Sequence, residues 1–223
     1  ILKEQEKRRN IMNEILSTEQ TYLSDLKLLY ERFIDPLTEN KILSQKNLED
    51  IFSGLDIVLS TNTEFLDELE PIITGTSEPK EVIVSELFIQ SAPKFKNYAV
   101  YITNYSHSAN TIRKLQKKNK KFDEFLNTTA TQFQKEGIRI IKIGSYLITP
   151  VQRLPRYRLL LEDLARHTPP KFKDIHSKIL EAIDSIKGVA DYINSKQRET
   201  EDKVFMTALQ EELGLRVWGN NFS

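Results

Sequence analysis

Few residues of this chain combine the type and the spacing that covalent or metal chemistry requires. The sequence has no cysteine, which excludes disulfides, thiolate metal ligands and a cysteine nucleophile. Its histidines are His107, His167 and His176, which stand apart without metal-ligand spacing, and we expect ordinary surface positions for them. Neither a phosphate-binding glycine loop nor a hydrolase or metalloprotease motif is present. The sequence therefore predicts action through a binding surface, with no metal, cofactor or covalent catalysis.

Glu19 is a carboxylate on an apolar helical stripe. It follows Ile15 by four residues and precedes Tyr22 by three, so it shares their face of the predicted helix. An unpaired buried carboxylate is strongly unfavourable, so this group must be paired, hydrogen-bonded or placed at a rim. Spacing alone favours a rim glutamate or a core ion pair. The alternative is a carboxylate at the edge of a surface that receives a partner.

The segment SYLITPVQRLPRYRLLLEDL, residues 145–164, combines a core stripe with a mostly polar face. The stripe contains Leu147, Val151 and Leu154. Steps of three and four residues join the members of the other face, which are Ile141, Ser145, Thr149, Gln152 and Arg156. A polar face that ends in one aliphatic residue suits recognition of a partner. An ordinary exposed face with one stray isoleucine is the alternative.

The run RKLQKKNKK, residues 113–121, carries six basic residues but no aromatic residue. A solvated helix end explains this run better than nucleic-acid binding, because the 32 basic and 32 acidic side chains of the chain balance. No apolar run approaches the roughly 20 residues that span a bilayer. We therefore expect no nucleic-acid partner, and any attraction to a membrane would have to be local.

The composition and the periodicity both predict helices. With 7 glycines and 8 prolines in 223 residues, the chain has few tight turns, which favours long helices over a many-stranded β fold. Apolar residues recur at helical steps in five stretches, namely 11–33, 48–69, 84–105, 138–164 and 175–193. The sequence predicts one all-α domain, an elongated bundle of about five or six long helices.

Several residues predict the breaks between these helices. We expect Pro71 to end the second helix, and Pro150 and Pro155 to bend the fourth, which starts near Ile138. Residues 127–137 are polar and predict a connection with short helical pieces. After residue 202 a helical face continues, and Gly214 is typical of a helix C-cap.

Four motifs in the sequence resemble those of one family. They are ILSTEQTYLSDL, LFIQSAPKFKNYAVYITNY, TPVQRLPRYRLLLEDL and GVADYINSKQR, in this order along the chain. Together they resemble the Dbl-homology (DH) domain, the module that catalyses guanine nucleotide exchange on Rho-family GTPases. The resemblance covers residues 1–201. It implies a DH domain at 1–202, followed at 203–223 by a helical extension or linker toward a further domain. The segment 203–223 is itself too short to be a pleckstrin-homology domain.

The resemblance implies roles for several residues. Glu19 matches an acid that hydrogen-bonds the first switch loop of the GTPase, so donors of the partner would satisfy its carboxylate. Asn194 matches an amide that contacts the second switch loop. Thr149 departs from the family, in which a basic residue is common at this position. Ile141 and Ser145 match positions that select among GTPases, and isoleucine leans toward a Rac-like partner. Gln152 shares the binding face.

The resemblance also implies a mechanism and a cellular setting. A regulator that binds the nucleotide-free GTPase most tightly accelerates GDP release and GTP loading without an acid, a base or a cofactor of its own. The resemblance implies Rho signalling to the actin cytoskeleton from the cytoplasm, with recruitment to membrane or cytoskeleton and membrane contact only through a neighbouring domain. The alternative is a helical scaffold or membrane-associated bundle that keeps the fold without exchange activity. Thr149 and the basic run support that alternative.

Overall fold

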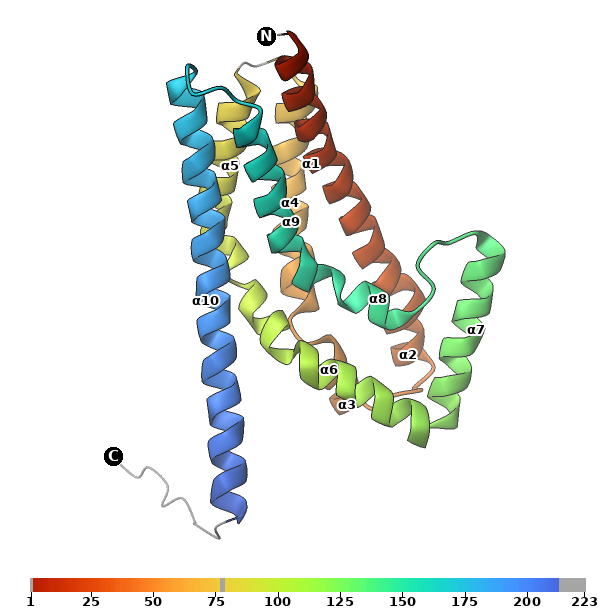
Figure 1. Cartoon of the computed structure of the whole chain (residues 1–223). Helices are drawn as coiled ribbons and strands as arrows, with labels where there is room; N and C mark the ends of the chain where they lie inside the picture. The colour runs from red at the N-terminus through yellow and green to blue at the C-terminus, as the bar shows by residue number, and fades with distance from the viewer. Residues whose placement is uncertain (1, 77–78, 213–223) are drawn as a thin grey trace.

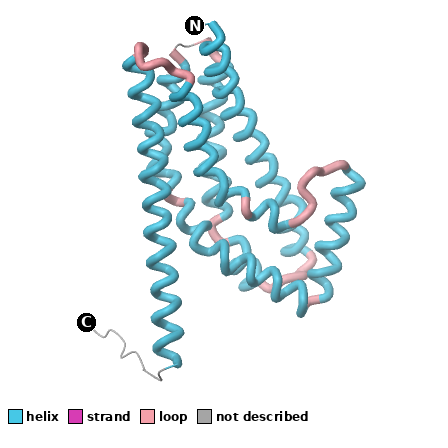
Figure 2. The backbone as a smooth tube through the Cα atoms, in the orientation of Figure 1, coloured by secondary structure: helices cyan, strands magenta, loops and turns pink. Residues whose placement is uncertain are grey.

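The computed structural model describes residues 2–76 and 79–212, and these residues form helices and short connections without a strand (Figure 2). The elements follow in the order α1 (Leu2–Leu29), the π-helix η1 (Tyr30–Ile34), α2 (Asp35–Glu39), α3 (Gln45–Phe52), α4 (Leu55–Thr74), α5 (Lys80–Phe95), α6 (Tyr98–Lys118), α7 (Lys120–Glu136), α8 (Ile143–Leu147), α9 (Thr149–Arg166) and α10 (Lys173–Glu212).

The long helices form an elongated bundle, which confirms the predicted fold class. Helix α9 packs between α1 and α10, and α4 and α5 lie behind these three helices (Figure 1). Helix α6 crosses the lower part of the bundle, where it packs on α3, α10 and α7. Helix α7 stands at the edge of the molecule, opposite α10 (Figure 1). The layer of α1, α9 and α10 therefore presents adjacent helix surfaces on one side of the bundle.

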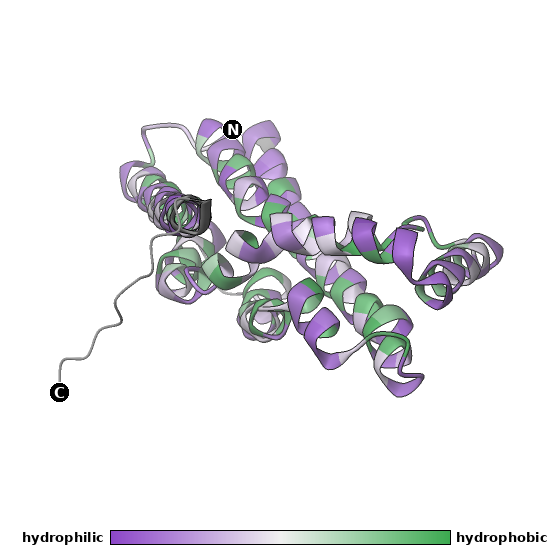
Figure 3. Cartoon of the chain, turned by 90° about the horizontal axis from the view of Figure 1, so that it is seen from below, coloured by the Kyte–Doolittle hydropathy of each residue, from purple (hydrophilic) through white to green (hydrophobic). Residues whose placement is uncertain are grey.

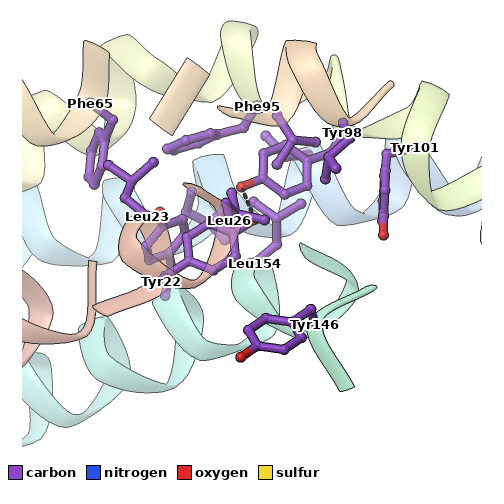
Figure 4. Packing of buried hydrophobic residues seen from close by; sticks show 14 of the residues in the cluster. Tyr22, Leu23, Leu26, Phe65, Phe95, Tyr98, Tyr101, Tyr146 and Leu154 are labelled. Atoms are coloured by element: carbon purple, nitrogen blue, oxygen red, sulfur yellow. Dashed lines mark hydrogen bonds between the residues drawn. The ribbon is translucent and has the colours of Figure 1, made fainter. Parts of the chain in front are cut away.

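Amphipathic helices hold the bundle together. Hydrophobic and hydrophilic residues alternate around the helices when the molecule is viewed from below (Figure 3). Aromatic side chains from different helices meet in the core, among them Phe65 of α4 and Phe95 of α5, whose ring centroids lie 5.3 Å apart. Figure 4 shows these rings beside Tyr22 and Tyr98, whose hydroxyl oxygens are separated by 3.2 Å. The core thus contains polar groups that need internal partners.

The second predicted helix consists of two helices, α3 and α4. They are separated at Gly54, whose φ of 78° lies in the left-handed region that glycine adopts readily. A side chain at Gly54 would also collide with the backbone of α6, since a Cβ there would lie 2.9 Å from the nitrogen of Tyr101. The predicted end at Pro71 is wrong, because α4 continues to Thr74.

The third predicted helix and the predicted connection after it also differ from the structure. The apolar pattern from residue 84 onward is shared by α5 and α6, which are separated by a turn at residues 96–97. The predicted connection at residues 127–137 is wrong, because residues 127–136 belong to α7. This helix begins where the side chain of Asn119 accepts a hydrogen bond from the backbone of Phe122 at 3.2 Å. Its buried residues are spaced by three and four and contact the core, an arrangement that the polar composition concealed.

The helix predicted from Ile138 begins later. Gly137, with a φ of 71°, ends α7, and an irregular connection occupies residues 138–142. The short helix α8 then precedes α9, which begins at Thr149 and has Pro150 in its first turn, where a missing N–H removes no internal bond. The proline therefore starts a helix here, whereas Pro155 lies inside α9.

Helix α10 contains the last predicted stripe, with Ile179, Ile183 and Ile186 buried. It continues without interruption through residue 202 to Glu212, so the helix itself marks no domain boundary there. The proposed cap at Gly214 lies outside the described residues.

Candidate functional site

Glu19 lies in the centre of the bundle and is fully buried, with 0% of its surface exposed. Arg153 of α9 donates to carboxylate oxygen Oε2 of Glu19 through Nε at 3.0 Å and also through Nη2. The hydroxyl of Tyr157 donates to the same oxygen at 2.5 Å. The other oxygen, Oε1, accepts from the side-chain amide of Asn62 in α4 at 2.8 Å. Four internal hydrogen bonds therefore satisfy this carboxylate.

The hydrogen-bond network extends from Glu19 across the bundle. Tyr98 of α6 donates to Oδ1 of Asn62 at 2.5 Å, and the hydroxyls of Tyr98 and Tyr22 are in contact. The guanidinium of Arg153 also lies over the ring of Tyr157, 4.4 Å from its centroid. Burial, reinforced by the charge of Glu19, raises the pKa of Tyr157 well above its usual value, so this phenol keeps its proton and donates.

This geometry decides between the alternatives for Glu19. The carboxylate forms a core ion pair, as spacing alone favoured. The expectation that donors of a partner satisfy it is wrong, because Arg153, Tyr157 and Asn62 of its own chain already do so and exclude solvent. Glu19 therefore joins α1, α4 and α9 beneath the surface, and the exposed acids of α1 lie elsewhere.

Glu14 is an exposed acid of α1 that the sequence analysis missed. Its carboxylate lies 3.3 Å from the guanidinium of Arg156 on α9, and about half of each side chain is exposed. The sequence contains a signal for this position, since Glu14, Thr18, Thr21 and Asp25 follow one another at steps of four, three and four residues. These residues form the edge of α1 that faces α9.

A pocket of 300 Å³ lies between the exposed edges of α1 and α9. Its lining residues are Thr18, Thr21, Tyr22, Asp25, Thr149, Gln152, Arg153 and Arg156. Two predicted site residues, Thr149 and Gln152, therefore meet here, and Gln152 is exposed. The hydroxyl of Thr149 donates to the carbonyl oxygen of Tyr146 at 2.7 Å, so it is engaged within its own chain. We call this pocket and its rim, including Glu14, the α1–α9 face.

Ile141 and Ser145 lie in a second pocket, of 560 Å³, formed by α6, α7, α8 and the connection before α8. Ile141 is half-buried and belongs to that connection, so the predicted helical step from Ile141 to Ser145 is wrong. Asn194 is exposed on α10 and lines neither pocket. The predicted residues other than Glu19 thus lie in three separate places, namely the α1–α9 face, the pocket beside α8 and the exposed surface of α10.

The other sequence features have simpler surroundings. All six basic residues of the run 113–121 are exposed around the junction of α6 and α7, in agreement with a solvated helix end. His107 is exposed, but His167 is half-buried, with Nδ1 2.8 Å from the carboxylate of Glu4. Within residues 2–76 and 79–212, no group of three or more histidine and acidic side chains is arranged to hold a metal. In the same residues, no helix has the length and apolar character of a membrane span.

The fold is an all-α module in which a helical layer with exposed polar side chains lies above a buried polar network. Its family follows from comparison with known proteins. The sequence model of the RhoGEF domain matches residues 11–194, and the chain belongs to this family of Rho guanine nucleotide exchange factor domains.

Relatives and solved structures agree with this assignment. The chain is 32% identical over 209 residues to guanine exchange factor for Rac 30 of Dictyostelium discoideum, covering 93% of the chain and 12% of the relative. Human Rho guanine nucleotide exchange factor 17 is 32% identical over 202 residues, which cover 87% of the chain and 9% of that protein. The chain thus spans a small part of these relatives.

The fold is shared with structures of other exchange factors. A structure of the Vav1 exchange factor superposes with a TM-score of 0.84 at 23% identity, covering 99% of this chain and 56% of the other. The DH/PH fragment of PDZRHOGEF in complex with human RhoA gives a TM-score of 0.78 at 21% identity, covering 92% and 58%. These likenesses confirm the DH-domain fold.

Proposed function

We propose that this chain is a guanine nucleotide exchange domain that binds the switch loops of a Rho-family GTPase and promotes GDP release and GTP loading. Family membership supports this activity. The observation that carries the proposal is the α1–α9 face, where exposed polar groups of two helices stand above a buried network that fixes both helices. Such a surface can bind a loop in one defined conformation.

The mechanism follows from linkage between two binding equilibria. If the domain binds the nucleotide-free GTPase more tightly than the GDP-bound form, GDP affinity must fall by the same factor in the complex. Catalysis then consists of stabilising the state in which the phosphate-binding loops are displaced. The domain regulates a GTPase and forms no covalent bond, so stiff helices with a few placed side chains suffice.

We propose that Glu14, and not Glu19, contacts the first switch loop. Glu14 takes the role that the sequence analysis gave to Glu19, because its carboxylate is exposed at the edge of the α1–α9 face. Arg156 holds this carboxylate in position and can itself contact acidic groups of the partner. Gln152 and Thr149 extend the contact along α9, and Asn194 on α10 contacts the second switch loop.

We propose that Ile141 and Ser145 take part in choosing the GTPase. Ile141 is only half-buried and can pack against an apolar side chain of the partner. A Rac-like partner is favoured by this isoleucine and by the names of several relatives, including Rac guanine nucleotide exchange factor B of Dictyostelium discoideum. The domain would act in the cytoplasm, where Rho-family GTPases signal to actin, and would reach membranes through neighbouring domains.

A nucleotide-release assay tests the proposal. Rac-like, Rho-like and Cdc42-like GTPases loaded with a fluorescent GDP analogue are mixed with the domain and excess GTP, and the fall in fluorescence is followed. We expect acceleration for at least one GTPase, with the largest effect on a Rac-like member. If a folded domain accelerates no member but binds GTPases or anionic liposomes, the scaffold function is correct instead.

A further inference from the structure

Asp25 of α1 is a half-buried carboxylate that lines the pocket of the α1–α9 face. Within the part of the chain that the structure describes, no hydrogen bond or ion pair engages its oxygens. Burial raises the pKa of the Asp25 carboxyl, and no neighbouring cation lowers it again. A charged group kept in such a place lowers the stability of the free domain.

The arginines of the pocket are already engaged by other acids. Arg153 pairs with the buried Glu19 and also donates to the hydroxyl of Thr18 at 3.3 Å. Arg156 pairs with Glu14 at the rim. The two arginines are thus paired with Glu19 and Glu14, and the carboxylate of Asp25 has no counter-charge in the pocket.

Thr149 of α9 supplies no positive charge to the pocket. It lines the same pocket as Asp25, and its only side-chain donor is directed to the carbonyl of Tyr146. A basic residue at this position could have neutralised Asp25, whereas threonine leaves the carboxylate available. The charge of the pocket is therefore uncompensated in the free domain and open to a partner.

We propose that Asp25 is a specificity-determining residue that accepts an ion-paired hydrogen bond from a lysine or arginine of the bound GTPase. This inference rests on the proposed function, because the pocket lies within the face assigned to the partner. A counter-charge would offset the desolvation cost of Asp25 only in the complex, so it would strengthen association and would not stabilise the free domain. A GTPase without a cation at this place would leave the carboxylate desolvated and unpaired, and would be discriminated against.

The test compares Asp25→Asn with the wild-type domain in stability and in nucleotide release. Asparagine keeps the shape and removes the charge, so we expect a higher thermal midpoint at neutral pH. With the preferred GTPase, we expect the domain concentration for half-maximal release to rise about 10-fold, the usual effect of losing one charged hydrogen bond. The matched control is Asp67→Asn on the exposed surface of α4, which should change neither quantity.

Scanning the partner identifies the cation. Replacing the lysines and arginines of the GTPase switch loops one at a time should reveal one variant whose loss is not additive with Asp25→Asn. If the wild-type domain accelerates nucleotide release and Asp25→Asn accelerates it equally well, the inference is overturned and the proposed function stays intact. Absence of release by the wild-type domain with every GTPase would instead overturn the proposed function. A lower thermal midpoint for Asp25→Asn would show that the carboxylate stabilises the fold, which also contradicts the inference.

Discussion

Arg153 of α9 donates two hydrogen bonds to the fully buried carboxylate of Glu19 on α1, although 134 positions separate the two residues in the sequence. Tyr157 and Asn62 donate the other hydrogen bonds to this carboxylate. The pair therefore fixes the position of α1 relative to α9, and both helices contribute to the exposed face. A buried ion pair of this kind contributes geometric definition, whereas its net contribution to stability is small or negative.

Substitution of Glu19 by alanine is expected to reduce the free energy of unfolding by about 3–5 kcal/mol, because Arg153 is left buried without a counter-charge. Urea unfolding followed by circular dichroism measures the loss. The matched control is Glu14→Ala, an exposed acid on the same helix, for which little change is expected. Equal midpoints for the two variants would contradict the burial of Glu19.

Substitution of Glu14 by alanine is expected to slow nucleotide release about 10-fold or more without changing the thermal midpoint, because one charged contact to the GTPase is lost. Release rates over a range of domain concentrations measure the effect. Glu6→Ala, another exposed acid of α1, should retain the wild-type rate. A normal rate for Glu14→Ala would refute the role that we propose for this residue.

Substitution of Asn194 by alanine is expected to produce a smaller loss of release than Glu14→Ala, because a neutral hydrogen bond contributes less than a charged one. The residue is exposed on α10, so the fold should be unaffected. Asn110→Ala on the surface of α6 is the control for an exposed asparagine. An unfolded Asn194→Ala protein would favour a structural role for this amide.

Substitution of Thr149 by lysine would bring an ammonium group into the pocket that contains Asp25. We expect a higher thermal midpoint from pairing with Asp25, and slower release because the carboxylate is no longer available to the partner. Both the rise in thermal midpoint and the fall in release rate should be smaller when Thr149→Lys is combined with Asp25→Asn. Faster release with an unchanged midpoint would show that charge at position 149 acts on the GTPase and not on Asp25.

The buried tyrosines predict a loss of stability at alkaline pH. Burial raises the pKa values of Tyr22, Tyr98 and Tyr157 above the value of about 10 for an unfolded chain. Above about pH 10 the unfolded state releases these protons and the folded state retains them, so stability decreases as pH rises, by about 1.4 kcal/mol per pH unit for each tyrosine. Urea unfolding between about pH 8 and pH 11 measures the slope. Tyr22→Phe should make it shallower.

The sequence by itself determined the helical class, most of the helix positions and the family. These depend on local information, namely the spacing of apolar residues and short motifs such as TPVQRLPRYRLLLEDL. Local patterns failed where the composition was polar, as in α7, and where prolines had to be assigned to a helix start, a helix interior or a helix end, as at Pro150 and Pro71.

Only the tertiary structure decided the role of Glu19 and the position of the exposed acids. Periodicity places Glu19 on the buried stripe, but its donors come from positions 43, 134 and 138 residues away, which no local pattern identifies. Packing of α9 against α1 also decides that Glu14 and Asp25 border the same face, one with a cation and the other without. Charge pairing depends on distance in space, and that distance exists only after the helices have assembled.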